Sequence, residues 1–156
     1  MKRLALAALF AIMTVCGYAQ NSSEVEETVR NIVHKYEGAD GVNCMSVVKG
    51  QGLEFIKMML KKEFGKSFMK GVTSITIINY TDAPEDICMA IRNDLDVFLS
   101  LLDEFDLGDE KQFSDNDYIR CFAAEDSGKL SDFVVAVENK ESKTVMYMAG
   151  EIIVED

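Results

Sequence analysis

Apolar residues recur along the chain at two spacings, one helical and one extended. Three stretches repeat them every three or four positions, as one face of an α-helix does. We therefore predict helices at residues 23–36, 52–64 and 82–105, the first opened by a capping box of Ser23 and Glu26 and the last by Asp82 and Glu85. Gly65 interrupts the pattern after the second helix.

Extended segments rich in Val, Ile, Thr and aromatic residues predict strands. They cover residues 42–48, 72–80, 117–124, 132–138 and 143–154, with Gly150 marking a bulge or bend in the last strand. The resulting order, α-β-α-β-α-β-β-β, predicts an α+β domain. Its three helices pack on one face of a largely antiparallel sheet of about five strands.

The first nineteen residues have the pattern of an export signal. Lys2 and Arg3 precede an apolar run over residues 4–15, and Gly17 and Ala19 are small residues before a cleavage point. We predict a signal peptide at 1–19, a single domain at 20–156, and a location in the periplasm or outer envelope. Val15 before Cys16 does not favour lipid attachment, and no later stretch is apolar enough to span a membrane.

Charge and cysteine number narrow the function classes. The formal net charge of −11 argues against nucleic-acid binding, which needs clustered Lys and Arg. Removal of the signal peptide leaves three cysteines, Cys44, Cys88 and Cys121. Their spacing does not indicate which two of them would form a disulfide. We predict buried, unreactive thiols. A thiol redox protein is a weaker hypothesis, which needs two of the three within disulfide reach.

The sequence offers no recognisable catalytic motif. His34 is the only histidine, and the helical spacing turns it away from the centre of its apolar stripe. Nucleophile elbows, phosphate loops, dinucleotide fingerprints and Cys-x-x-Cys pairs do not occur. We therefore expect no catalytic residue and no cofactor, and the enzyme hypothesis rests on acidic residues alone.

Acidic residues crowd the end of the third predicted helix and the segment after it. Their oxygen ligands suit Ca²⁺, although their spacing fits no EF-hand loop, so a solvated acidic loop is the simpler interpretation. The alternative hypothesis for function is that this cluster binds a metal ion or forms the active site of a carboxylate- or metal-dependent hydrolase. It contains Asp103, Glu104, Asp106, Asp109, Glu110, Asp115 and Asp117.

Basic residues gather in the opposite charge pattern over residues 57–70. Five lysines against one glutamate give this stretch a charge of +4, whereas residues 82–126 carry −11. The lysines can pair with the acidic half of the same chain, or bind an acidic envelope protein, an anionic surface or a second copy of the chain. They are Lys57, Lys61, Lys62, Lys66 and Lys70, beside the apolar Met58, Met59, Phe64, Phe68 and Met69.

Several segments together resemble a known family. They are residues 34–42 (His-Lys-Tyr-Glu-Gly-Ala-Asp-Gly-Val), 114–117 (Ser-Asp-Asn-Asp) and 148–153 (Met-Ala-Gly-Glu-Ile-Ile). Over residues 24–154 the chain resembles the family of domain of unknown function 4252, small exported proteins of Bacteroidetes. The resemblance implies export and a single domain, and it supplies no catalytic residue to carry over. The leading hypothesis is thus a non-catalytic binding module of the cell envelope that uses the basic helix at 57–70.

Overall fold

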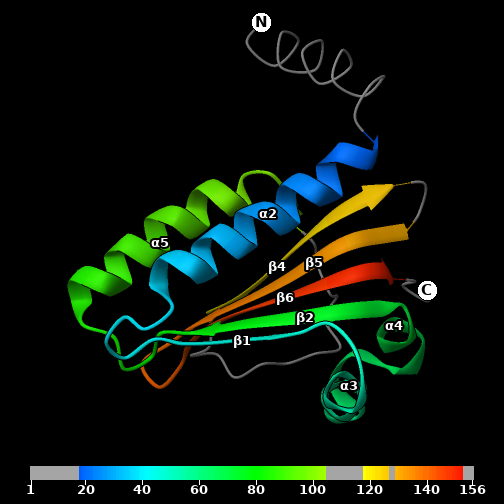
Figure 1. Cartoon of the computed structure of the whole chain (residues 1–156), viewed down its shortest axis with the longest axis horizontal. Helices are drawn as coiled ribbons and strands as arrows, with labels where there is room; N and C mark the ends of the chain where they lie inside the picture. The colour runs from blue at the N-terminus through cyan, green and yellow to red at the C-terminus, as the bar shows by residue number, and fades with distance from the viewer. Residues whose placement is uncertain (1–17, 105–117, 127–128, 153–156) are drawn as a thin grey trace, which may run out of the picture.

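The structure, a computed structural model, describes residues 18–104, 118–126 and 129–152 (Figure 1). Within these ranges no helix is long and apolar enough to cross a bilayer. The described residues form four helices: α2 (Tyr18–Tyr36), α3 (Gln51–Phe64), α4 (Lys66–Lys70) and α5 (Glu85–Leu99). Six strands form one sheet: β1 (Asn43–Val47), β2 (Val72–Asn79), β3 (Asp103–Glu104), β4 (Tyr118–Asp126), β5 (Lys129–Glu138) and β6 (Lys143–Ile152).

Every neighbouring pair of strands in the sheet is antiparallel, in the order β1-β2-β6-β5-β4-β3. This arrangement confirms the predicted α+β class. The last three strands form the expected meander, and β2 inserts next to β6 rather than next to the strand that follows it in sequence. The sheet therefore has two edges, β1 and the two-residue β3.

Helices cover both faces of the sheet, so the prediction that all helices pack on one face is wrong. In Figure 1, α2 and α5 lie side by side over one face, whereas α3 and α4 lie on the other side near β2. The reason is visible in β5, where consecutive residues Phe133, Val134 and Val135 are all buried and therefore point alternately into two separate cores. A strand that is apolar on both faces needs cover on both.

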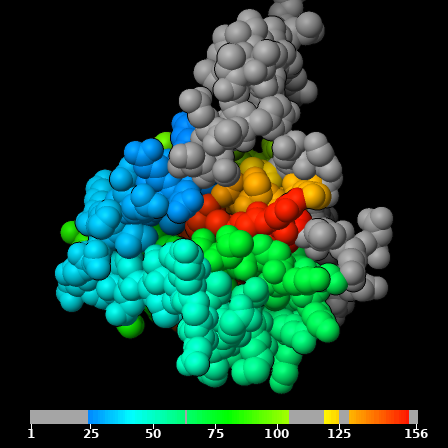
Figure 2. All heavy atoms as spheres, turned by 45° about the vertical axis from the view of Figure 1, so that its right-hand side comes forward, coloured from blue at the N-terminus to red at the C-terminus, as the bar shows by residue number. Residues whose placement is uncertain are grey.

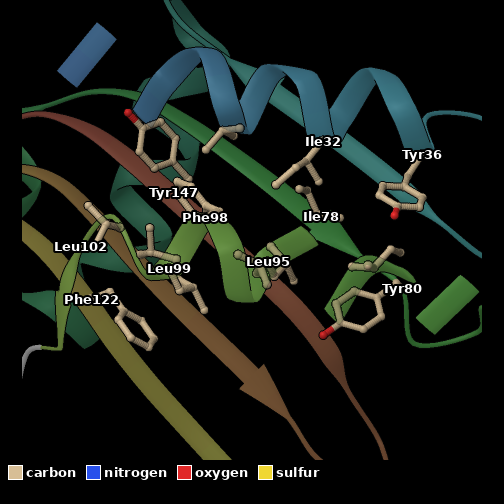
Figure 3. Close-up of a cluster of buried hydrophobic side chains, with 14 of the residues drawn as sticks. Ile32, Tyr36, Ile78, Tyr80, Leu95, Phe98, Leu99, Leu102, Phe122 and Tyr147 are labelled. Atoms are coloured by element: carbon tan, nitrogen blue, oxygen red, sulfur yellow. The ribbon is translucent and has the colours of Figure 1, made fainter. Parts of the chain in front are cut away.

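The larger core lies between the sheet and the pair α2 and α5 (Figure 3). The predicted stripes supply it, because Val25, Val29 and Ile32 of α2 face Leu95 and Phe98 of α5. The second core lies under α3 and α4 and is built on the opposite side chains of the same strands. The central strands thus hold both helical layers.

Several element ends differ from the predicted ends, most of all those of the helices α2 and α5. Helix α2 begins at Tyr18, so Ser23 lies inside the helix and is not its N-cap. Helix α5 begins after Pro84 rather than Asp82 and ends at Leu99, six residues before the predicted end. A turn follows instead, in which Leu102 is buried as it would be in a helix, and the chain then pairs with β4 as strand β3.

Gly65 and Gly150 have the roles that the sequence predicts. Gly65, with φ of 89°, separates α3 from the five-residue α4, which was not predicted as a separate helix. Gly150, with φ of 143°, lies where the pairing of β6 with both neighbours shifts register. A Cβ atom there would lie 2.1 Å from the carbonyl oxygen of Gly71, so only glycine fits this bulge.

A polar contact joins α2 to α5 at the surface. Lys35 Nζ and the Tyr36 hydroxyl donate to the same Asp94 carboxylate oxygen at 2.7 and 2.6 Å. These two donors hold the pKa of Asp94 below its ordinary value. Because the folded-state pKa is lowered, the stability from this contact is present above the ordinary Asp pKa and is lost as the pH falls through the lowered value.

We expect Tyr36→Phe to lower the free energy of unfolding by about 1 kcal/mol at neutral pH, the usual net contribution of such a hydrogen bond. Urea denaturation at neutral and strongly acidic pH measures this difference. The loss is expected to shrink in acid, where a protonated Asp94 is a weaker acceptor. An equal loss at both pH values would show that ring packing, not the charged acceptor, is responsible.

Candidate functional site

Helix α3 is fixed to the sheet by its inner side. Leu53 is buried, and Ile56, Leu60 and Phe64 pack partly buried against the second core, at the spacings that the sequence predicts. Below them, Phe133 of β5 meets Phe68 of α4 and Phe64 edge-on, with ring centroids 4.9 and 6.1 Å apart. This aromatic contact fixes the position of both short helices and thereby the direction of their outer sides.

The outer side of α3 exposes large apolar side chains. Phe55, Met58 and Met59 are 59%, 61% and 60% exposed. Their positions i, i+3 and i+4 form one stripe on the side opposite the core. Single exposed apolar residues are ordinary, but adjacent ones on one helix face are typical of an interaction surface.

Lysines accompany this stripe. Lys61 and Lys62 of α3 and Lys66 and Lys70 of α4 are exposed, and none of them forms an ion pair with another described residue. Lys57 differs from them, since its side chain is only 15% exposed and lies 3.6 Å from Glu54. We call the exposed set the α3–α4 surface: Phe55, Met58, Met59, Lys61, Lys62, Lys66 and Lys70.

The structure changes the predicted apolar neighbours of these lysines. Phe68 and Met69 are buried at 6% and 2% exposure, and Phe64 is partly buried in the second core, so none of the three belongs to an outer apolar patch. Phe55, which sequence analysis missed, is the exposed aromatic residue instead. In the space-filling view, residues 51–70 form the lower part of the molecule, in turquoise to green (Figure 2).

The predicted acidic site falls mostly outside the described residues. Asp106, Asp109, Asp115 and Asp117 all lie in the undescribed range 105–117. Asp103 and Glu104 are exposed on the edge strand β3, and Glu104 pairs with Arg120 at 3.3 Å. In the described part of the chain, no group of three or more His, Cys, Asp or Glu residues is arranged to hold a metal ion.

The sequence did not predict a buried polar cluster that lies on the face of the sheet covered by α2 and α5, opposite the α3–α4 surface. Asp132 of β5 is fully buried and accepts hydrogen bonds from the Tyr147 hydroxyl of β6 and from Ser131 Oγ at 3.0 Å. Burial raises the pKa of Asp132, and burial beside this carboxylate also raises the pKa of Tyr147. The signal in the sequence was an acidic residue at an inward-facing position of an otherwise apolar strand.

A small cleft opens next to this cluster between α2 and the sheet. Its volume is about 100 Å³, and Tyr147, Ser46, Ser74 and Thr76 line it from the strands. Glu26 and Arg30 of α2, which pair at 3.1 Å, lie at the same cleft. Because a drug-sized ligand site occupies about 300–1,000 Å³, this cleft is too small for an organic substrate of ordinary size.

The histidine and the three cysteines, which were the other candidate reactive groups, lie on the surface or in the core. His34 is exposed, as the helical spacing predicted, with Nδ1 3.8 Å from Glu37. Cys88 and Cys121 are buried, as predicted, whereas Cys44 is only half-buried. Burial raises the pKa of the Cys44 thiol, which lowers the fraction of reactive thiolate.

Comparison with known proteins finds no matching family model, no matching curated protein and no matching solved structure. The resemblance to the family of domain of unknown function 4252 therefore stays a prediction. Any functional argument for this chain rests on its own residues, above all on the α3–α4 surface.

Proposed function

We propose that this protein is an exported, non-catalytic binding module of the cell envelope that binds an anionic partner through its α3–α4 surface. The observation that carries the proposal is the side-by-side exposure of Phe55, Met58 and Met59 with Lys61 and Lys62. Apolar contacts supply affinity when they leave water, and unpaired lysines attract and orient an acidic partner.

The close packing of α3 against the sheet supports this proposal. Its inner residues and the Phe64–Phe68–Phe133 contacts hold the helix on the sheet, so the outer side chains need no backbone ordering when a partner binds. Preorganisation lowers the entropic cost of association. The export signal at 1–19 and the family resemblance agree with a role in the envelope, and both remain part of the proposal.

A hydrolase using the acidic cluster at 103–117 is the alternative. It predicts a pocket lined by several carboxylates, at least one with a strongly shifted pKa. The two described members, Asp103 and Glu104, are exposed on an edge strand. The described residues therefore give the alternative less support than the binding module has.

The proposal predicts that Lys61→Glu/Lys62→Glu abolishes capture of the partner in a pull-down from envelope extract. The matched control is Arg30→Glu/Lys140→Glu, which changes net charge by the same amount at exposed positions in α2 and in the turn between β5 and β6. Lys57 is left unchanged because it is mostly covered and paired with Glu54. Circular dichroism checks that each variant folds.

Capture by the unaltered chain and by the control, but not by Lys61→Glu/Lys62→Glu, is the expected result. Equal loss in both double variants would mean that total charge, rather than this surface, determines binding. Equal capture by all three chains would place the binding site elsewhere. If the Phe55→Ser/Met58→Ser variant still captured the partner, the apolar stripe would have no role in binding.

A further inference from the structure

We propose that the anionic partner of the α3–α4 surface is the lipid surface of a bilayer, with α3 lying in the plane of the membrane interface. This inference rests on the proposed function and names its partner class. It uses three observations: the shape of α3, the chemistry of its exposed side chains, and the charge of the rest of the protein.

The exposed stripe runs along one side of α3. Phe55, Met58, Met59 and Lys62 occupy positions i, i+3, i+4 and i+7, and they lie opposite Leu53 and the other inner residues. A helix of 14 residues is about 21 Å long, so all four side chains can reach one flat surface together. Interfacial helices bind membranes in this orientation, with their axis parallel to the bilayer.

The exposed side chains suit the boundary between headgroups and acyl chains. Phe and Met are apolar, and the unbranched Met side chain adapts to irregular surroundings. Lysine keeps its ammonium group at the level of the lipid phosphates while its methylene stem covers apolar surface. Lys61 and Lys62 stand at the end of the stripe, and Lys66 and Lys70 continue the positive charge along α4.

A lipid surface fits this site better than a folded acidic protein does. A stable protein interface buries about 1,200–2,000 Å² and usually fixes its anchor residues in walled pockets. The surface depression beside the stripe, lined by Gly50, Gln51, Glu54, Phe55 and Met58, is open and wide rather than walled. A soft bilayer accepts three protruding, flexible side chains without needing a matching cavity.

The charge of the whole chain then orients the protein. The formal net charge is −11, so an anionic bilayer repels most of the molecule. Residues 57–70 carry +4 and are the exception. Among the surfaces of the described residues, the one formed by α3 and α4 carries this positive charge. An approach with α3 and α4 first is therefore electrostatically favoured, which leaves α2 and α5, on the opposite face of the sheet, turned away from the membrane.

Single-tryptophan reporters test this orientation, because the chain contains no Trp. Phe55→Trp places a reporter in the stripe, and Val97→Trp places a matched reporter at a 67% exposed position of α5 on the opposite face. Both full-length variants are mixed with phosphatidylcholine vesicles made with or without phosphatidylglycerol. The readouts are the emission maximum and quenching by brominated lipid, which report the position of each reporter and are insensitive to where other segments bind.

We expect Phe55→Trp to shift to the blue and to be quenched only with vesicles that contain phosphatidylglycerol. Adding Lys61→Glu/Lys62→Glu should weaken this response at least tenfold, since one lysine near an anionic surface contributes about a factor of five. Salt should weaken it as well. Val97→Trp should respond to neither vesicle.

Three results would overturn the inference: no response of Phe55→Trp to anionic vesicles, an equal response to both vesicle types, or an equal response of Val97→Trp. The envelope pull-down separates this failure from failure of the proposed function. Protein capture that depends on Lys61 and Lys62, without a vesicle response, refutes the lipid inference and leaves the binding module standing. A vesicle response that depends on Lys61 and Lys62, without protein capture, supports both, because the bilayer is then the anionic partner. Loss of both results refutes both.

Discussion

Phe133→Ala is expected to lower the free energy of unfolding by about 3–5 kcal/mol, the range found when a buried aromatic side chain is truncated. Phe133 is fully buried and contacts Phe64 of α3 and Phe68 of α4 edge-on. Its removal leaves a cavity between the sheet and both helices. It also breaks two aromatic contacts that contribute about 0.5–1.5 kcal/mol each beyond the area they bury.

Urea denaturation of the wild type, Phe133→Ala and Val97→Ala measures this effect. Val97 is 67% exposed on α5, so its truncation should change stability by less than about 0.5 kcal/mol. Amide hydrogen exchange adds a positional test. The amides of α3 and α4 should lose protection before those of α2 and α5, because the two helical layers have separate cores.

A uniform loss of protection over all four helices would contradict this separation. The separation matters for function as well, because Phe133 lies on the opposite side of α3 from the exposed stripe. A loosened α3 would present Phe55 and Met58 in variable directions, and binding through the α3–α4 surface would weaken together with stability.

The local elements were largely predictable because burial follows local spacing. Ile91, Leu95 and Phe98 repeat at helical intervals and are buried on one side of α5, as their pattern predicts. The same pattern continues to Leu102, where it misled the prediction. A pairing with β4, distant in sequence, extends the chain as β3 at Asp103 and Glu104, and local spacing carries no information about that partner.

The placement of helices on both faces could have been predicted from one feature. Phe133, Val134 and Val135 form a continuous apolar run, and a strand covered on only one face alternates apolar and polar residues. What the run could not reveal is which helix covers which face. That choice depends on the position of β2 next to β6, which is a tertiary pairing.

The candidate site was predictable in its charge but not in its apolar part. The lysines were found from their density alone. The prediction grouped Phe68 and Met69 with them, whereas the break at Gly65 turns both residues into the core. Phe55 was missed because an exposed aromatic residue on an amphipathic helix has no sequence signal beyond lying off the inner stripe.

Tyr147→Phe is expected to lower the free energy of unfolding by about 1–3 kcal/mol at neutral pH, the usual cost of removing a hydrogen-bond partner from a buried acceptor. The Tyr147 hydroxyl is one of two side-chain donors to the fully buried Asp132, and Ser131 is the other. The Tyr147 ring lies edge-on to Phe98 (Figure 3), and a phenylalanine ring at this position can make the same contact, so the loss of stability reports the hydrogen bond.

The same carboxyl group predicts an unusual dependence of stability on pH. Burial, helped by the charge of Glu26, raises the pKa of Asp132 more than its two donors lower it. A raised folded-state pKa means that the stability is fully present below the ordinary Asp value of about 3.9 and is lost as the pH rises through the raised value. Asp132→Asn keeps an acceptor for Tyr147 without a charge, so it should gain stability relative to wild type as the pH rises.

Urea denaturation over a pH series tests this sign, with Asp94→Asn as the matched control. The pKa of Asp94 is lowered by Lys35 and Tyr36, so its contribution has the opposite direction and grows as the pH rises. The stability differences of Asp132→Asn and Asp94→Asn from wild type should therefore slope in opposite directions. Parallel slopes would mean that Asp132 is ionised at low pH and that its two donors outweigh burial, which makes the buried carboxylate a stabilising anion rather than a cost.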